Sequence, residues 1–391
     1  MKMKWKKVNM TSPRACRALL SRFPPRAFSM AYGSGVFEQA ADSASASSSS
    51  SSSSSAVSSS PKPMIDLVFA VDDPRAWHAA NLERNPSDYA AHFRALGSQR
   101  GGAAAAWVQE TGGAAVFYHP AVDAGNGVLI KYGVVATETL ALDLDAWATL
   151  FVAGRLHKPT TVLEEWGPRG EEIDDVATDG PRTAAAAAAA PGFAALQHRN
   201  LTCAAAVASL LLPPRFDEHE LFMAIANISY AGDARFLLGA EAPGKVRSIV
   251  DGSFAGFQTL YREPLAACGE WIKRIDDDGN GGGDAQSVSP FQQLERDASP
   301  EAVERAALAG AIPAAVRERI APNRPLAAQA AELARLARDG DDALAAAVHG
   351  ALASIVRAHS FGQQLKGVAS AGPGRAISYG LAKLRKGGWS V

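Results

Sequence analysis

The chain has 391 residues, of which 47% are hydrophobic and 20% are charged, as expected of a globular protein long enough for two domains. Its formal net charge of -1 excludes a protein that coats nucleic acid through an overall basic surface. The cysteines are odd in number and widely separated (Cys16, Cys203 and Cys268), which excludes a disulfide framework and a zinc site with close cysteine pairs. No run of about 18 apolar residues is present, so we expect no membrane-spanning helix and only peripheral membrane contact.

The N-terminal segment is rich in lysine and arginine, and the first acidic residue is Glu38. Serine and leucine are interspersed among these cations. This composition is typical of an organellar targeting sequence. We therefore interpret residues 1–30 as a mitochondrial transit segment, with a disordered basic arm as the alternative.

Low-complexity segments divide the rest of the chain. The serine-rich residues 42–61 have little apolar surface to bury, so we predict a disordered insertion. An alanine run lies between Pro181 and Pro191, which are too close together for a long stable helix, so residues 181–192 are predicted to form a linker. The glycine- and aspartate-rich residues 276–284 are predicted to form a loop.

The ordered residues before the linker combine strand and helix patterns. Met64 to Val71 is an apolar run interrupted only by Asp66, which predicts a buried strand that carries one carboxylate. Ala114 to Tyr118 and Val128 to Ala136 predict a hairpin, with Lys131 inside its second strand.

A helix is predicted next, because apolar residues recur at helical spacing from Leu140 to Phe151 and the pattern ends near Arg155, before Pro159. Beyond Pro191 the periodicity is mainly helical. The segments with the clearest helical pattern are Asn200 to Leu212, Asp217 to Ile228, Pro300 to Ala309 and Ala327 to Val356. We therefore place one α+β domain at residues 31–180 and a helical domain at residues 193–360.

A phosphate-binding loop is the first candidate for chemistry. The small residues of Gly33-Ser34-Gly35 allow backbone N–H groups to approach phosphate oxygens, although the same triplet is also typical of a plain turn. Helix-forming residues and then the Asp66 strand follow it. This order resembles the DNA polymerase β nucleotidyltransferase superfamily, in which the loop holds a triphosphate and strand carboxylates hold Mg²⁺.

A second metal-binding carboxylate is harder to assign. The superfamily places it two residues after the first, where this chain has Val68. Asp72 follows Asp66 by six residues on the same face of a strand and is our tentative second ligand, although it is equally suited to capping the strand end. Asp143 and Asp145 are further candidates, but the position of Asp143 at a helix start favours N-capping.

A more specific resemblance covers the chain from about Tyr32 to its C-terminus, to the mitochondrial phosphatidate cytidylyltransferases, also called translocator assembly and maintenance proteins. The blocks that carry it are Tyr32-Gly33-Ser34-Gly35-Val36-Phe37, Met64-Ile65-Asp66-Leu67, Trp77-His78 with Asn81, Ile130-Lys131-Tyr132-Gly133-Val134-Val135, Ala153-Gly154-Arg155-Leu156-His157-Lys158-Pro159, Ser229-Tyr230-Ala231-Gly232-Asp233-Ala234-Arg235, Lys245-Val246 with Ile249-Val250, Leu365-Lys366-Gly367 and Ala371-Gly372.

The family resemblance accounts for Val68, which the family has as well. It leaves two departures: Asp88 begins a segment that reads His-Tyr-Ser in the family, and His119 replaces an asparagine. If either polar group touches nucleotide or lipid in the family, that contact is in doubt here.

The resemblance implies a polymerase β-type nucleotidyltransferase domain followed by a mostly helical, winged-helix-like domain. It also implies the transfer of CMP from CTP to phosphatidic acid, which yields CDP-diacylglycerol and pyrophosphate for phosphatidylglycerol and cardiolipin synthesis. The enzyme would be peripheral on the matrix face of the mitochondrial inner membrane. Because the attacking phosphate is already an anion, the protein has to align two polyanions and neutralise the leaving group, with Mg²⁺ held by Asp66.

Several cations are predicted to contact the nucleotide. Lys131 is costly inside an apolar strand unless it is paired, although an exposed strand face is the alternative. Arg155 and Lys158 end a helix, where the helix dipole also favours cations. The other nucleotide- or phosphate-binding candidates in the family blocks are Tyr132, Tyr230, Asp233, Arg235 and Lys245. His78 and His157 are expected to be structural, because neither has a second ligand at metal spacing.

The C-terminal residues 361–391 contain no acidic residue. We expect this segment to dock on an anionic membrane leaflet, with a solvated basic tail as the alternative. The cations that would make the contact are Lys366, Arg375, Lys383, Arg385 and Lys386. Two rival functions remain: a polymerase β-type transferase that acts on RNA or a soluble acceptor, for which we see no basic surface interleaved with aromatic residues, and a non-catalytic factor that supports membrane translocases.

Overall fold

The computed structural model describes residues 13–33, 64–125, 128–168, 191–233, 244–275 and 291–371. Some predictions therefore fall outside the described residues. These are the Ser-rich insertion at 42–61, most of the linker at 181–192, the loop at 276–284, and the individual residues Ser34, Gly35, Arg235, Arg375, Lys383, Arg385 and Lys386.

A five-stranded mixed sheet forms the first half of the molecule, in the order β3-β4-β2-β1-β5. β2 and β4 run parallel, and the other neighbouring pairs are antiparallel. The strands are β1 (Phe28–Tyr32), β2 (Met64–Val71), β3 (Phe117–Asp123), β4 (Leu129–Ala136) and β5 (Thr161–Glu164). Together with the many helices, this sheet agrees with the predicted α+β class. β3 and β4 form the predicted hairpin, although its first strand was predicted at 114–118 and lies at 117–123.

One face of the sheet is covered by helices from the first third of the chain. Ile65, Leu67 and Phe69 of β2 point to this face and pack with Trp77. The helix that carries Trp77 begins where the Asp73 side chain accepts a hydrogen bond from the backbone N–H of Ala76. The elements of this layer are α3 (Pro74–Arg84), the short 3₁₀ helix η1 (Pro86–Asp88), α4 (Ala91–Ala95) and α5 (Gly97–Glu110).

The segment predicted to be a transit sequence is part of this fold from residue 13 onward. α1 (Pro13–Leu20) buries Cys16 and Leu20 against the sheet, and β1 is its fourth strand. Phe28 and Met30 are fully buried. A chain cut at residue 30 would therefore lose a packed helix and most of a strand that lies between β2 and β5.

The opposite face of the sheet carries α6 (Thr137–Ala146), α7 (Ala153–Leu156) and α9 (Phe193–Ser209). The single helix predicted from Leu140 to Arg155 is in fact two. Trp147 ends α6 in the left-handed region, with φ of 60°, and its side chain is fully buried. The apolar periodicity continued through this break because Trp147 and Phe151 still face the core.

The second half of the molecule is mainly helical, as predicted, but it includes a three-stranded antiparallel sheet in the order β6-β8-β7. These strands have only three or four residues, too few for an alternating pattern to be recognised in the sequence. The strands are β6 (Arg215–Asp217), β7 (Ile272–Ile275) and β8 (Gln293–Arg296), and the helices are α10 (Glu218–Ile228), α12 (Lys245–Gly252), α13 (Phe254–Ala267), α14 (Pro300–Leu308), α15 (Ala314–Ile320), α16 (Leu326–Asp339) and α17 (Asp341–Ala371).

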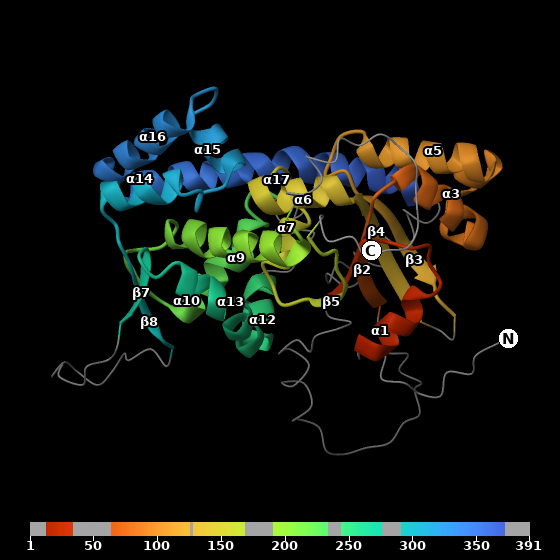
Figure 1. Ribbon diagram of the computed structural model, residues 1–391, viewed down its shortest axis with the longest axis horizontal. Coiled ribbons are helices and arrows are strands. Elements are labelled where there is room, and N and C mark those ends of the chain that lie inside the picture. Colours follow the sequence, from red (N-terminus) through yellow and green to blue (C-terminus); the bar gives the residue numbers. More distant parts are fainter. Residues whose placement is uncertain are drawn as a thin grey trace, which may run out of the picture.

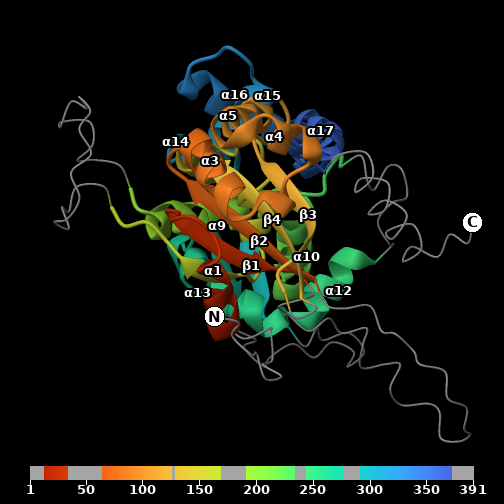
Figure 2. The same ribbon diagram turned by 90° about the vertical axis from the view of Figure 1, so that its right-hand side faces the viewer.

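α17 runs along the length of the molecule and joins its two halves (Figure 1). Seen from the side, it lies next to α5 (Figure 2). Gln363 donates to the carbonyl of Val116, and His359 contacts the carbonyl of Gly113. A single hydrophobic cluster extends from Phe28 of β1 to Val356 of α17, so the two halves share a continuous core.

Lys366 lies in the part of α17 that packs on α5. Its side chain is buried, and its ammonium donates a 2.6 Å hydrogen bond to the carbonyl of Gln109. Its predicted membrane contact is therefore not compatible with the structure, because the charge points into the protein. Among the described helices, none combines the length and the apolar character that crossing a membrane requires.

Candidate active site

Asp66 and Lys131 face each other on neighbouring parallel strands. They are partners in the register of β2 and β4, and Tyr32 pairs with Asp66 from the other side, on β1. The Lys131 Nζ atom lies 3.8 Å from Asp66 Oδ1. The Asp66 side chain keeps 21% of its exposure, while its Oδ1 atom is buried, so the carboxylate is only partly accessible.

Gly33 places backbone directly above this carboxylate. It follows β1 with φ of 84°, a conformation that favours glycine. A Cβ atom at this position would lie 3.0 Å from Asp66 Oδ2. The first residue of the predicted Gly33-Ser34-Gly35 loop therefore lies where a bound phosphate would be close to both the backbone and Asp66.

Arg155 approaches the same place from α7, which lies between the sheet and the helical half (Figure 1). Its guanidinium stacks 4.0 Å from the Phe151 ring centroid and 5.6 Å from that of Tyr32. It also donates to the Phe151 carbonyl. Burial, followed by the charges of neighbouring groups that include Asp66, raises the pKa of Tyr32 well above its usual value, so this phenol stays neutral.

Lys158 lies just after α7 and connects it to the second half. Its ammonium donates to the Gly154 carbonyl at 2.8 Å and to Ser229 Oγ at 2.9 Å, and it lies 5.0 Å from the Tyr230 ring centroid. Lys245, at the start of α12, has its Nζ atom 6.0 Å from the centroid of the same Tyr230 ring.

Three cations thus gather around this edge of the site. Burial, together with the charges of Arg155 and Lys245, lowers the pKa of Lys158 to about 7. An anion bound among them would relieve this repulsion. The arrangement therefore favours a highly charged anion such as a triphosphate.

Asp143 determines the path of the chain into α7. This buried residue lies inside α6, and its carboxylate accepts hydrogen bonds from the Thr149 hydroxyl and from four backbone N–H groups. The N–H donors belong to Thr149, Leu150, Val152 and Ala153, at 2.8–3.0 Å. Asp143 is thus neither a metal ligand nor the cap of its own helix, but the acceptor that shapes the turn leading to Arg155.

Tyr132 is not part of this group. Side chains alternate along a strand, so Tyr132 points away from the face of Lys131 and is fully buried. Its hydroxyl donates to Asp88 Oδ2 at 2.9 Å and accepts from Asn81 at 3.0 Å. The prediction that Tyr132 binds nucleotide is therefore wrong.

The two departures from the family pattern belong to the same buried network. Asp88 forms an ion pair with Arg22, and its backbone carbonyl contacts His119 Nδ1 at 3.2 Å. The His119 ring stacks on Tyr132 with a centroid distance of 4.2 Å. Both residues therefore lie on the face of the sheet opposite Asp66, away from the candidate site.

Asp72 is also excluded from the site. β2 is extended from Met64 to Val71, so six residues separate Asp72 from Asp66 by about 20 Å. Ligands of one Mg²⁺ lie within about 2.1 Å of the ion. In the part of the chain that the structure describes, no group of three or more His, Cys, Asp or Glu side chains is arranged to hold a metal ion.

The two predicted structural histidines are both buried and hydrogen-bonded. His157 contacts Asn200 Oδ1 at 2.9 Å, and burial, with the charge of Lys158, lowers its pKa to about 3. His78 contacts Tyr89 and Gln109, and burial lowers its pKa to about 4. Both rings are neutral, which is consistent with packing roles.

The structure adds a residue that the sequence reasoning missed. The Tyr118 ring lies 4.8 Å from Lys131 Nζ, measured to the ring centroid. Gly133 makes this possible, because a Cβ atom there would be 2.8 Å from the Tyr118 ring. A glycine inside a strand often marks a close approach of this kind, so Gly133 was the available signal.

The predicted residues that remain are Tyr230 and Asp233. Tyr230 lies between Lys158 and Lys245, as described above. Asp233 is buried at the end of the same turn, where its backbone N–H donates to the Tyr230 carbonyl at 3.1 Å. The turn therefore contributes Tyr230 to the site surface, while Asp233 is held below it.

Comparison with known proteins identifies the family. Residues 16–386 match the family model described as mitochondrial phosphatidate cytidylyltransferase. Proteins of that name from Xenopus laevis, Danio rerio and Mus musculus are 34%, 33% and 32% identical to the chain, and each alignment covers 95% of this chain and 93% of the relative. The chain therefore belongs to the mitochondrial phosphatidate cytidylyltransferase family.

Proposed function

We propose that this protein transfers CMP from CTP to phosphatidic acid, forming CDP-diacylglycerol and pyrophosphate. The observation that carries the proposal is the pairing of Asp66 with Lys131 beneath Gly33, opposite the cations of Arg155, Lys158 and Lys245. A single carboxylate surrounded by cations suits a nucleotide triphosphate together with an anionic acceptor.

The reaction needs alignment and charge neutralisation. A phosphate oxygen of phosphatidic acid forms a bond to the α-phosphorus of CTP, and the bond from that phosphorus to the oxygen that bridges to the β-phosphate breaks. Because this oxygen is already anionic, no residue has to remove a proton from it. Lys131 and Arg155 would hold the triphosphate, and Lys158 and Lys245 would neutralise charge on the acceptor and on the leaving pyrophosphate.

Mg²⁺ fits the donor chemistry of this site. The ion commonly binds one or two carboxylates together with substrate phosphates, and Asp66 is a partly exposed carboxylate whose Oδ2 atom lies next to Gly33. Asp66 would hold the ion, which when bound would add Lewis-acid polarisation of the phosphates.

The same proposal includes a domain type for each half of the molecule. A glycine turn next to a strand carboxylate in a mixed sheet supports a polymerase β-type nucleotidyltransferase domain. The small antiparallel sheet packed with α10 and α13 supports a winged-helix-like second domain.

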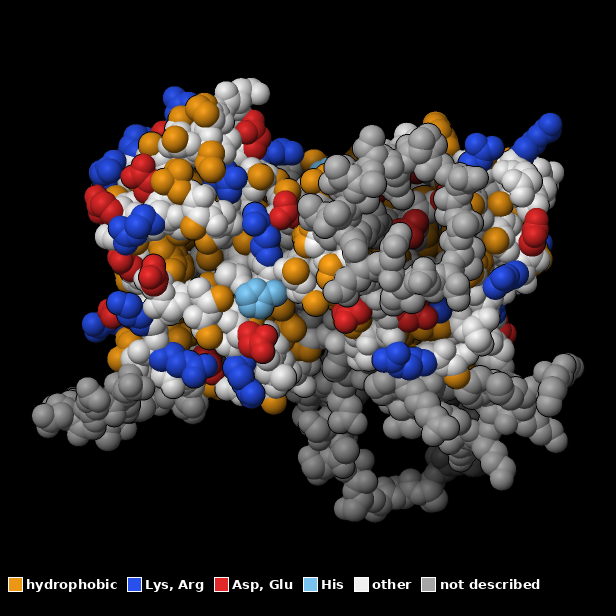
Figure 3. All heavy atoms as spheres, in the orientation of Figure 1, with side chains coloured by type: hydrophobic (Ala, Val, Ile, Leu, Met, Phe, Trp, Pro, Cys, Tyr) orange, Lys and Arg blue, Asp and Glu red, His pale blue; other side chains and the backbone are white. Residues whose placement is uncertain are grey.

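We further propose that the protein works peripherally on the matrix face of the mitochondrial inner membrane, supplying CDP-diacylglycerol for phosphatidylglycerol and cardiolipin. The naming of its relatives as mitochondrial phosphatidate cytidylyltransferases supports this placement. On the surface seen in Figure 3, basic and acidic side chains are interspersed, which fits a lipid and nucleotide substrate better than a nucleic acid.

The test is incubation of the full chain with Mg²⁺, phosphatidic acid vesicles and CTP labelled in its α-phosphate. We expect labelled CDP-diacylglycerol and unlabelled pyrophosphate. A parallel reaction with RNA oligonucleotides should leave the RNA unlabelled. Folded protein that labels RNA instead, or that yields no labelled lipid, would contradict the proposal and favour one of the two rival functions.

A further inference from the structure

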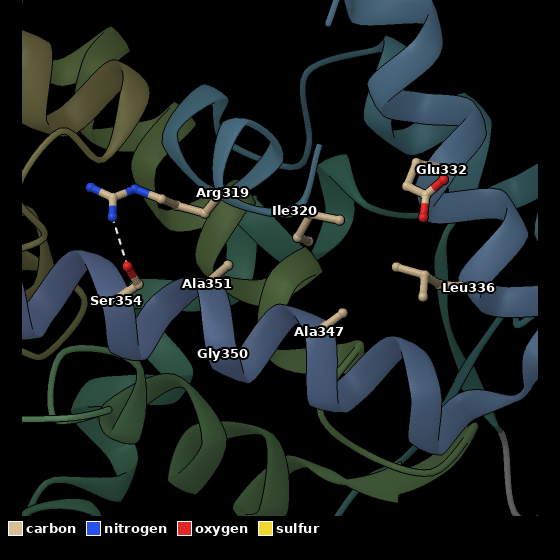
Figure 4. Close-up of a pocket in the computed structure, with 8 residues that line it drawn as sticks. All are labelled: Arg319, Ile320, Glu332, Leu336, Ala347, Gly350, Ala351 and Ser354. Atoms are coloured by element: carbon tan, nitrogen blue, oxygen red, sulfur yellow. Dashed lines mark hydrogen bonds between the residues drawn. The ribbon is translucent and has the colours of Figure 1, made fainter. Parts of the chain in front are cut away.

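A groove runs along the solvent side of α17 where this helix meets α15 and α16 (Figure 4). It consists of two adjoining cavities of about 320 and 590 Å³, which share Arg319, Gly350 and Ser354. None of these residues belongs to the site described above.

The larger cavity is positively charged. Arg319, Arg357 and His349 line it together with Ser354 and small residues, and its lining contains no Asp or Glu. Arg319 donates a 2.6 Å hydrogen bond to Ser354 Oγ, which orients the guanidinium while using one of its five N–H donors. The cavity therefore offers fixed positive charge to an anion.

The carboxylate in the neighbouring cavity does not cancel this charge. Glu332 lines the smaller cavity near Leu336 (Figure 4). It forms ion pairs with Arg335 at 2.8 Å and with Arg324 at 3.7 Å. Two further arginines thus balance its charge.

An exposed aromatic side chain continues the groove. Phe361 is 60% exposed, and it follows Arg357 by four residues, which places both on the same face of α17. An exposed ring next to arginines on a helix surface is typical of a peripheral membrane contact, in which the cations meet headgroups and the ring enters the interface.

The groove is connected to the candidate active site through one turn. Gly232 has φ of 68°, and a Cβ atom there would lie 2.7 Å from the carbonyl oxygen of Ala353, which lines the larger cavity. The same turn carries Ser229 and Tyr230, which contact Lys158. Through Ala353, α17 therefore contacts the same turn that carries Ser229 and Tyr230.

We propose that this groove docks the enzyme on an anionic phospholipid surface, with Arg319 and Arg357 at headgroup phosphates and Phe361 in the interface. The inference rests on the proposed function, because a lipid acceptor is what makes docking necessary. The groove also provides an accessible surface for the membrane contact that was predicted for Lys366, whose charge is buried.

The test is flotation of the purified full chain with vesicles of phosphatidylcholine, with and without phosphatidylglycerol. We expect binding only with phosphatidylglycerol, and about 30-fold weaker binding for the double variant Arg319→Gln, Arg357→Gln, because each cation near an anionic surface contributes about fivefold. Phe361→Ser should weaken binding as well. The matched control is Arg215→Gln, Arg305→Gln, which removes two charges that are 76% and 68% exposed elsewhere, and it should bind within about twofold of wild type.

Equal binding of the groove variant and wild type would overturn the proposal, as would an equal loss in the control pair. A second readout is turnover of a short-chain phosphatidic acid in solution, which the groove variant should retain. A loss there, with an unchanged melting temperature, would assign the groove to substrate binding and overturn docking. Failure of the proposed function would look different. Wild type would then turn over neither phosphatidic acid in vesicles nor the short-chain form in solution, whereas flotation would still measure its binding to vesicles.

Discussion

Lys158 combines two roles that oppose each other in the free protein. Its hydrogen bonds to Gly154 and Ser229 hold it at the junction of the two halves, while burial and the nearby charges of Arg155 and Lys245 make protonation costly. A bound triphosphate would restore the favourable environment for its charge. The pH dependence of nucleotide binding therefore reports on this residue.

We predict that CTP affinity falls as the pH rises through about 7, the pKa of Lys158 in the free protein. Below this pH the ammonium is already charged, and above it binding has to take up a proton, so affinity declines by up to about tenfold per pH unit. Calorimetric titration between about pH 6 and about pH 9 measures this decline. Lys158→Arg should flatten the dependence, because a guanidinium stays charged; an unchanged slope in that variant would assign the effect to another group.

At this scale the sequence named several residues that the structure places near one another. Asp66, Lys131, Arg155, Lys158 and Lys245 were all named from the chain alone, and the structure brings them together. Their types explain why, since a carboxylate or cation in an apolar segment is costly without a partner.

The errors at this scale concern direction and distance. Tyr132 follows Lys131 directly, so strand alternation sends it to the other face. Asp72 shares a face with Asp66 but lies at the far end of the strand. Tyr118 was missed because a tyrosine in a strand has no distinctive pattern until the space left by Gly133 is known.

At the scale of elements, the turn between α6 and α7 depends on Asp143. Five hydrogen bonds converge on its carboxylate. Sequence patterns could not predict this arrangement, because the acceptor lies inside one helix and its donors lie beyond a left-handed break at Trp147.

Asp143→Ala should therefore destabilise the fold by about 3–5 kcal/mol, because four buried N–H groups lose their acceptor. It should also lower kcat/KM by about tenfold or more, because Arg155 and Lys158 lose their position. Urea unfolding and initial rates below the unfolding midpoint measure the two effects. The control is Asp145→Ala. The Asp145 side chain is 49% exposed in its ion pair with Arg199, so this variant should change stability by less than about 1 kcal/mol. Similar losses in both variants would contradict this account.

Removal of α1 and most of β1 also has a testable consequence. A chain that starts at residue 31 lacks Phe28 and Met30, each of which contributes about 2–5 kcal/mol by its buried side chain, as well as the packing of α1. Since total stabilities are about 5–15 kcal/mol, we expect this chain to lose cooperative unfolding. A chain that starts at Pro13 should keep it in a circular dichroism melt, and identical melting of the two chains would show that α1 and β1 do not support the sheet.

Composition misled the interpretation of this segment. A basic, acid-free N-terminus is typical of targeting sequences, yet Arg22 and Arg26 form ion pairs with Asp88 and Glu164 inside the fold. Those partners are far away in the sequence, so no local pattern reveals them.

At the scale of the whole molecule, α17 and the shared core couple the sheet to the helical half. The sequence predicted both halves and their order, but it placed a boundary at residue 360, where the structure has a continuous helix from Asp341 to Ala371. The acid-free composition that suggested a tail begins inside this helix, and Gln363 and Lys366 use their polar atoms to bind the first half. Tertiary contacts of this kind are not encoded in local composition.

The coupling matters for function because the candidate site uses both halves. Asp66 and Lys131 belong to the sheet, while Tyr230 and Lys245 belong to the helical half. In the proposed mechanism, Asp66 is the carboxylate that would hold the metal ion against the triphosphate.

The most direct test compares two aspartates of the same segment by the initial rate of CDP-diacylglycerol formation from CTP and phosphatidic acid. Asp66→Asn should lower this rate by about 100-fold or more while the melting temperature is maintained, because the site loses its metal-binding carboxylate. Asp72→Asn should retain the rate within about threefold, since the two residues lie about 20 Å apart along β2. Activity that survives Asp66→Asn, or that falls equally in both variants, would contradict the assignment of Asp66 as the centre of the active site.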